Sequence, residues 1–213
     1  MKKKVLLITV LTIFCLAAEA GATNLVVNGG FESPVIYTVY VTDITPTGWT
    51  GMGDLVQQGY AGAVNSGDGN QWFDLNPGTS TSTGTSQNIS LNAGTDYLFS
   101  FLYDGGGGGT TTQISFSLQS GLGSLLSGAV STASMNVYGG TPWSTYSTTF
   151  DPSISGLYTL TFVPNGAWSG GFIDAVTISP TGTPTPGVPE PTTILLLGLG
   201  LIGVAGIRRK FKN

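Results

Sequence analysis

The chain has 213 residues, a net charge of −4 and only 8% charged residues. It contains no histidine, and all seven lysines and arginines lie before residue 5 or after residue 207. Residues 5–207 therefore lack the cations of a nucleic-acid site, the histidine of Ser-His-Asp and Cys-His mechanisms and the histidine ligands of zinc, so that carboxylates, hydroxyls, amides and aromatic rings remain.

The first 22 residues have the pattern of a secretory signal peptide. Three lysines precede an apolar run over residues 5–18, and small residues suited to cleavage follow this run. The only cysteine, Cys15, lies inside the same segment. We therefore expect an exported protein whose mature form has no disulfide and no thiolate metal site.

Residues 23–179 are predicted to form one all-β domain. Apolar and polar side chains alternate over residues 97–103, 114–118 and 158–162, which is the period of a half-buried strand. Similar short runs predict further strands over residues 24–28, 35–42, 70–75, 86–91, 143–150 and 170–179. About ten strands without a helical period favour a jelly-roll β-sandwich.

The C-terminal segment has the composition of a spacer followed by a membrane helix. Residues 180–187 are rich in proline, threonine and glycine and predict an extended linker. Residues 192–207 carry no charge, and as a helix this run would be about 24 Å long, slightly shorter than a bilayer core. The alternative, a buried core helix, is disfavoured because the run contains three glycines. A single transmembrane helix is predicted, with its basic end in the cytoplasm.

The tail over residues 188–213 resembles the PEP-CTERM sorting tail of Gram-negative bacteria that make exopolysaccharide. A Pro-Glu-Pro motif, an apolar run and a short basic end follow one another in the order of that family. The resemblance implies recognition by an exosortase-type membrane enzyme, an inner-membrane-anchored precursor, and delivery to the cell surface or extracellular matrix. It assigns the sorting signal to Val188, Pro189, Glu190, Pro191, Arg208 and Arg209.

The domain itself resembles galactose-binding-like jelly rolls, which include several families of carbohydrate-binding module. The resemblance is carried by Asn-Leu-Val-Val-Asn-Gly-Gly-Phe-Glu at residues 24–32, Gly-Trp at 48–49 and Gly-Phe-Ile-Asp-Ala-Val at 171–176. The family usually has an acid or an amide where this chain has Ala175. The resemblance implies a jelly-roll β-sandwich that binds carbohydrate without cleaving it.

The same resemblance implies a structural calcium, with Glu32 and Asp174 at the matching ligand positions. A separate argument concerns the charge of Asp174, which alternation places on one face with Phe172 and Val176. A carboxylate on an apolar face needs a partner, and this part of the chain has no cation, so a hard metal ion would be suitable. The alternatives are a carboxylate bound by backbone N–H groups and one at an exposed strand end.

Aromatic rings are the expected platforms for a sugar ligand. Trp49 lies in the Gly-Trp motif, and Trp72 lies in a further segment that resembles the family, Gly-Asn-Gln-Trp-Phe-Asp-Leu at residues 69–75, so we expect both in the core. Trp143 and Trp168 lie near predicted turns and are the candidate ligand-binding residues.

The sequence favours an exported, non-enzymatic surface or exopolysaccharide-matrix protein that binds polysaccharide. One alternative is a structural matrix or adhesion protein, as in a biofilm, without specific glycan binding. The other is a carbohydrate-active enzyme, which would need two carboxylates at a defined separation. The available acids for such a pair are Asp54, Asp68, Asp74 and Asp104.

Overall fold

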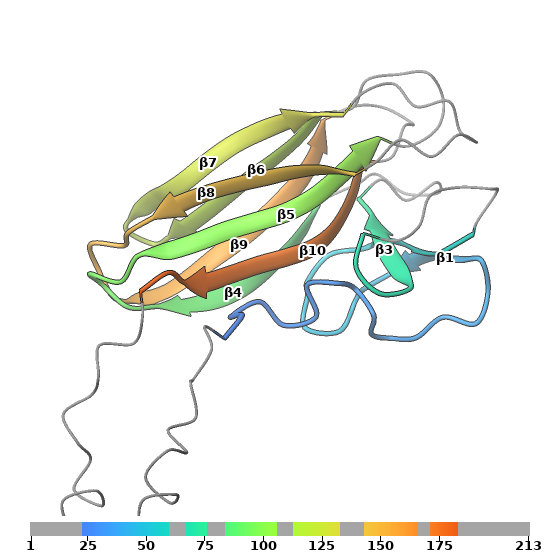
Figure 1. The fold of residues 1–213 in the computed structure, drawn as a ribbon, viewed down its shortest axis with the longest axis horizontal. Coiled ribbons are helices and arrows are strands. Elements are labelled where there is room, and N and C mark those ends of the chain that lie inside the picture. Colours follow the sequence, from blue (N-terminus) through green and yellow to red (C-terminus); the bar gives the residue numbers. More distant parts are fainter. Residues whose placement is uncertain are drawn as a thin grey trace, which may run out of the picture. The chain divides into compact units, whose positions relative to one another are not determined.

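The computed structural model describes residues 23–59, 67–75, 84–105, 113–132, 143–165 and 171–182, and Figure 1 shows their ribbon. The described residues form strands and no helix, so none of their segments is a candidate transmembrane helix. The strands are β1 (Tyr40–Ile44), β2 (Gly53–Gln57), β3 (Gln71–Asp74), β4 (Thr85–Leu91), β5 (Tyr97–Gly105), β6 (Gln113–Ser120), β7 (Gly123–Ser131), β8 (Ser144–Phe150), β9 (Gly156–Asn165) and β10 (Gly171–Pro180).

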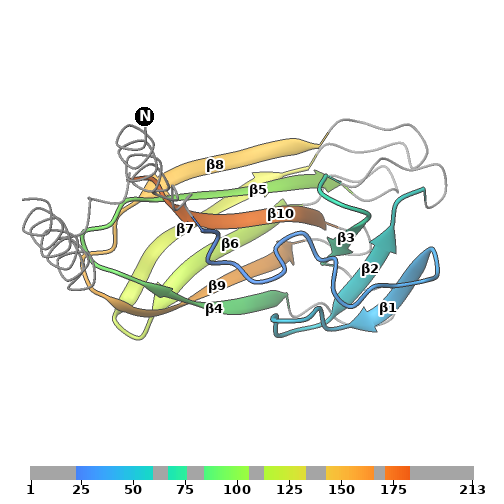
Figure 2. The ribbon, with the colours of Figure 1, turned by 60° about the horizontal axis from the view of Figure 1, so that its bottom comes forward.

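The ten strands form two antiparallel sheets, which confirms the prediction of an all-β jelly-roll sandwich. The larger sheet has the order β1-β2-β3-β10-β5-β8, and the smaller has the order β4-β9-β6-β7. The two sheets lie face to face (Figure 2). The predicted signal peptide, linker and membrane helix lie outside the described residues, apart from the first residues of the linker.

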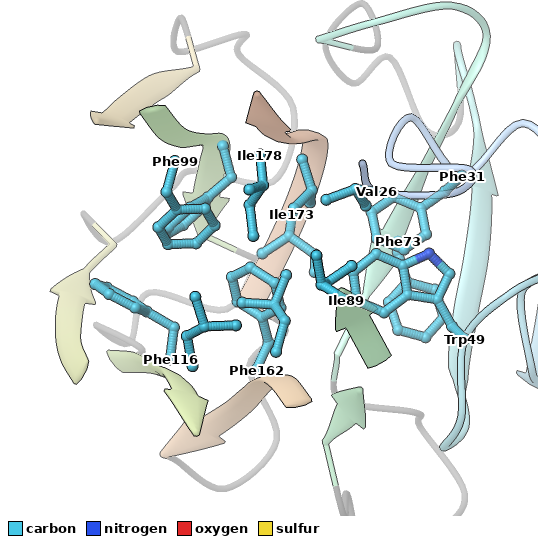
Figure 3. Packing of buried hydrophobic residues seen from close by; sticks show 14 of the residues in the cluster. Val26, Phe31, Trp49, Phe73, Ile89, Phe99, Phe116, Phe162, Ile173 and Ile178 are labelled. Carbon is cyan, nitrogen blue, oxygen red and sulfur yellow. The ribbon is translucent and has the colours of Figure 1, made fainter. Parts of the chain in front are cut away.

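The core fills the space between the sheets because the inward-facing positions of the strands are apolar and large. On β5, Phe99 and Phe101 point inward, and they meet Phe116 of β6 and Phe162 of β9 (Figure 3). The ring centroids of Phe101 and Phe162 are 5.0 Å apart, in an edge-to-face arrangement. Burying one such side chain contributes about 1.5–3 kcal/mol to folding, so the alternating pattern holds the two sheets together.

The outer face of the smaller sheet is polar and uncharged. Strands β4, β6, β7 and β9 contain no Asp, Glu, Lys or Arg. The strand register places four hydroxyl groups in one row across the sheet: Ser86, Thr161, Ser117 and Ser127. In the next row, the Thr159 hydroxyl donates to Asn88 Oδ1 at 2.9 Å. This face therefore offers mainly hydroxyls and amides, with the apolar Leu157 and Val163 of β9 beside them.

The N-terminal segment differs from its prediction. Residues 24–28 form no strand, since the backbone turns through positive φ at Asn28 (53°) and Phe31 (54°). Side chains replace the expected strand partners: Gln87 bonds to the backbone of Val27, and Asn24 Oδ1 accepts from Ile178 N. The segment is thus fixed against both sheets by amide side chains.

Candidate functional site

Glu32 and Asp174 lie at the two sides of one short segment, residues 67–71, that leads into β3. Glu32 Oε1 accepts the backbone N–H groups of Asn70 (2.6 Å) and Gln71 (2.7 Å). Asp174 Oδ2 accepts the backbone N–H of Asp68 at 2.8 Å. The structure therefore brings the two predicted metal ligands to the same segment, although they are far apart in the sequence.

Asp174 is fully buried. The pKa of its carboxyl group is raised to about 7, chiefly by burial and to a smaller extent by the nearby Asp68 carboxylate, while backbone N–H donors from Asp68 and Ala175 oppose the shift. Since residues 5–207 contain no Lys, Arg or His, no side-chain cation of this segment can offset the charge. Ionised Asp174 is therefore costly to bury unless a bound cation compensates it.

The prediction that Asp174 shares a face of the strand with Val176 is wrong. Ile173, Val176 and Ile178 belong to the core cluster, whereas Asp174 follows Ile173 on the opposite face of β10. The reason is a register shift between Asp174 and Thr177, where Ala175 has a φ of 48°. This irregularity breaks the alternation on which the prediction rested.

The arrangement of oxygens suits a hard cation only in part. Among the described residues, no group of three or more His, Cys, Asp and Glu side chains is placed to hold a metal ion. A calcium ion at Glu32 and Asp174 would thus need backbone carbonyl or water oxygens as further ligands. The alternative arrangement, in which backbone N–H groups bind the carboxylates, is present on both side chains.

A separate cavity of about 470 Å³ lies beside β4. Its lining consists of Val27, Gly48, Thr50, Ser86, Gln87 and Asn88. Among these described lining residues of the groove there is neither a carboxylate nor an aromatic ring. Because Ser86 and Asn88 also belong to the polar outer face of the smaller sheet, the groove continues into the rows of hydroxyls and amides on that face.

Hydrogen bonds make the walls of the groove rigid. The buried Gln87 donates from Nε2 to the carbonyls of Val27 (2.9 Å) and Gly48 (3.0 Å), and its Oε1 accepts from the N–H of Val27 (2.8 Å). Thr50 and Ser86 exchange two backbone hydrogen bonds of 2.8 Å. Three distant parts of the chain are therefore held in one fixed arrangement. A ligand that binds here would not have to order these segments, so little conformational entropy would be lost on binding.

The tryptophans divide between core and surface. Trp49 and Trp72 are buried, as predicted. Trp143 is half-buried and meets Trp72 edge to face with ring centroids 6.2 Å apart, and it does not line the groove beside β4. Trp168 lies outside the described residues.

The groove residues were missed because the sequence shows them only as an unremarkable strand. The alternation Ser86, Asn88, Ser90 predicts an exposed polar face but gives no sign of the wall that residues 48–50 add. Tyr37, 92% exposed, was missed as well. A lone tyrosine between Ile36 and Thr38 carries no spacing signal.

The fold defines a class, the jelly-roll β-sandwich. A family model described as a carbohydrate binding domain matches residues 23–170, and the chain belongs to this family. A second model, described as the PEP-CTERM protein-sorting motif, matches residues 187–210 and confirms the resemblance of the tail. Among curated proteins, no match is found.

Solved structures share the fold at low sequence identity. A Stig cyclase, Fisc, from Fischerella sp. TAU is 16% identical, with a TM-score of 0.55 over 74% of this chain and 97% of the cyclase. A cyclase from the same organism in complex with 4-(1H-indol-3-yl)butan-2-one is 17% identical, with a TM-score of 0.55 over 76% of this chain and 100% of the other. TmCBM61 in complex with β-1,4-galactotriose is 20% identical, with a TM-score of 0.45 over 73% of this chain and 97% of the module.

Proposed function

We propose that this protein is an exported cell-surface module that binds a neutral polysaccharide in the groove beside β4 and does not cleave it. The groove itself is the observation that carries the proposal. It is preformed, with Gln87 fixing its wall, and the polar groups that it offers are the hydroxyls of Thr50 and Ser86 and the amide of Asn88. The described lining residues include no carboxylate pair, so they do not provide the acid and base of a glycosidase.

The charge of the chain supports a neutral ligand over an acidic one. Between residues 5 and 207, every charged side chain is a carboxylate. An acidic polysaccharide would find no cation to pair with and would be repelled, whereas a neutral sugar needs only hydrogen-bonding partners. Binding should therefore depend weakly on salt, because neither partner of the groove contact is ionised.

Asn88→Ala is expected to weaken polysaccharide binding by about tenfold, the effect of losing one well-placed hydrogen bond of about 1.4 kcal/mol. The measurement is affinity electrophoresis of the full chain against a panel of neutral and acidic polysaccharides. Asn92→Ala, the same change in the turn after β4, serves as the matched control and should bind like the wild type. Equal mobility shifts for Asn88→Ala and the wild type would remove the groove from the site.

The predicted platforms Trp143 and Trp168 are tested in the same assay. Trp143 is the described member of the pair, and it packs against Trp72 on another part of the molecule from the groove. Loss of binding in Trp143→Ala, with normal binding in Asn88→Ala, would place the ligand on the aromatic residues instead.

We further propose that Glu32 and Asp174 hold a structural calcium. The support is the buried, raised-pKa carboxyl group of Asp174 in a segment of chain without a basic side chain. A calcium concentration of about 100 times the dissociation constant adds about 2.7 kcal/mol to the free energy of unfolding. A chelator is then expected to lower the thermal midpoint of the wild type by several degrees. Glu32→Gln should reduce this shift, and an unchanged midpoint in the wild type would remove the metal.

The sorting tail extends the proposal to the export route. An exosortase-type membrane enzyme would recognise the matched motif at residues 187–210, and the module would then reach the cell surface or an exopolysaccharide matrix. A structural matrix protein without specific glycan binding is the competing function. It is favoured by the absence of any aromatic ring from the outer face of β4, β6, β7 and β9, and it would be indicated if every polysaccharide in the panel fails to bind.

A further inference from the structure

The two edge strands of the smaller sheet, β4 and β7, differ in the contacts that they make with other described residues. At the β4 edge, Thr50 and Ser86 exchange backbone hydrogen bonds, and Gln87 binds the backbone of Val27. At the opposite edge, β7 pairs with β6 and with no other described strand. The beginning of the β4 edge is therefore covered by the chain itself, whereas no described strand pairs with the outer edge of β7.

The β7 edge lacks the usual protection against pairing with another strand. Natural edge strands are short, charged, interrupted by proline or bent by a bulge. β7 has nine residues and contains neither a charge nor a proline. Its register shift is confined to the hairpin end, between Leu118 and Gln119 of β6, and residues 126–131 pair regularly with β6. A regular, neutral strand edge remains beyond the shift.

The side chains of β7 leave room for a neighbouring strand. Leu126, Gly128 and Val130 lie opposite the buried Leu118, Phe116 and Ile114, so they face the core. The intervening positions are the small residues Ser127, Ala129 and Ser131, all exposed on the outer face. No bulky or charged side chain on this face would obstruct the approach of a second strand.

The positions of the carboxylates favour this edge as a contact between two copies of the chain. The acids of the described domain lie on β1, β2, β3, β5 and β10 or in loops, and none lies on the smaller sheet. Two copies of this chain that approach through β1, β2 and β3 of the larger sheet bring carboxylates towards carboxylates, without a cation to separate them. An approach through β7 keeps these charges apart, and it is therefore electrostatically favoured over that contact between like molecules.

We propose that β7 pairs antiparallel with β7 of a second copy of this chain. Such a contact is related by a two-fold axis, uses the same residues on both partners and is closed. It joins the two smaller sheets into one continuous sheet. The hydroxyl row that ends at Ser127 then continues into the row of the second copy, and the two polar faces become one surface.

The first test is the association state of the purified full chain in detergent, measured by sedimentation velocity without any glycan. The wild type is expected to form dimers, and Ala129→Lys, which places a charge on the proposed contact, should raise the dimer dissociation constant by at least about tenfold. Ser90→Lys adds the same charge to the same face on β4, at the opposite edge of the sheet, and it should leave the dimer unchanged. A monomeric wild type, or equal dimerisation of all three proteins, would overturn the proposal.

The second test locates the contact. In a Cys15→Ala background, Ser127→Cys is expected to form a disulfide-linked dimer under mild oxidation, whereas Ser90→Cys should remain monomeric on a non-reducing gel. Equal cross-linking of both variants would show contact through other surfaces and would also overturn the proposal. Because neither test contains polysaccharide, failure here leaves the proposed glycan function untouched, and failure of the glycan assay leaves the pairing of β7 untouched.

Discussion

The calcium-free protein is expected to lose stability as the pH rises through neutrality. The ordinary carboxyl pKa of 3.8 is raised to about 7 in folded Asp174, chiefly by burial. The folded state therefore holds a proton that the unfolded state has released, and this contribution is complete below about pH 4 and is lost as the pH rises through about 7. Between pH 5 and pH 9, the loss amounts to about 2.7 kcal/mol, since it is nearly complete once the pH passes 7.

Urea denaturation in the presence of a chelator measures this dependence. Asp174→Asn keeps the size of the side chain but removes the titrating group, so its midpoint should vary less between pH 5 and pH 9, whatever its absolute stability. Added calcium is expected to restore the wild type most strongly at high pH, because a cation binds the ionised carboxylate. A chelated wild type whose midpoint is constant, or rises, over this range would contradict the assignment of the shift to Asp174.

Gln71→Ala is expected to reduce the free energy of unfolding by about 3–5 kcal/mol, since each buried polar group left without a partner costs about 1–3 kcal/mol. The Gln71 side chain is buried and makes three hydrogen bonds. Its Oε1 accepts from Ile36 N at 2.7 Å, and its Nε2 donates to the carbonyls of Phe31 (2.9 Å) and Pro34 (3.1 Å). The variant leaves these backbone groups without their partner and loosens the segment that carries Glu32.

Equilibrium urea unfolding of the full chain in detergent measures this cost. Gln113→Ala removes the same side chain from an exposed position of β6 and should change stability by less than about 0.5 kcal/mol. A similar small effect for both variants would show that residues 31–36 are held by other contacts. The calcium response provides a second measurement, because a loosened Glu32 should also weaken the chelator effect.

Much of the fold follows from local alternation. β5, β6 and β9 combine period two with aromatic and β-branched side chains, and a strand was predicted within each of them. β7 was missed, because its sequence Gly-Ser-Leu-Leu-Ser-Gly-Ala-Val-Ser consists mainly of small residues and places two leucines side by side. It becomes a strand because β6 already offers a paired neighbour, a tertiary effect that overrides local propensity.

The candidate sites were predictable to different extents. The resemblance selected Glu32 and Asp174, and the structure places both beside residues 67–71. The face of Asp174 was not predictable, because the positive φ of Ala175 interrupts the alternation. The groove beside β4 was not predictable either, because its walls come from segments that meet only in the folded chain.

The central position of β10 determines how the domain would respond to a mechanical load. β10 is hydrogen-bonded to β5 along most of its length and to β3 at its beginning, and both neighbours run antiparallel to it. A pull on Thr181, which follows β10, acts along the strand and loads many hydrogen bonds at once in shear. An edge strand such as β8 would instead peel away one bond at a time. The C-terminal end of this domain is therefore the end suited to carry tension.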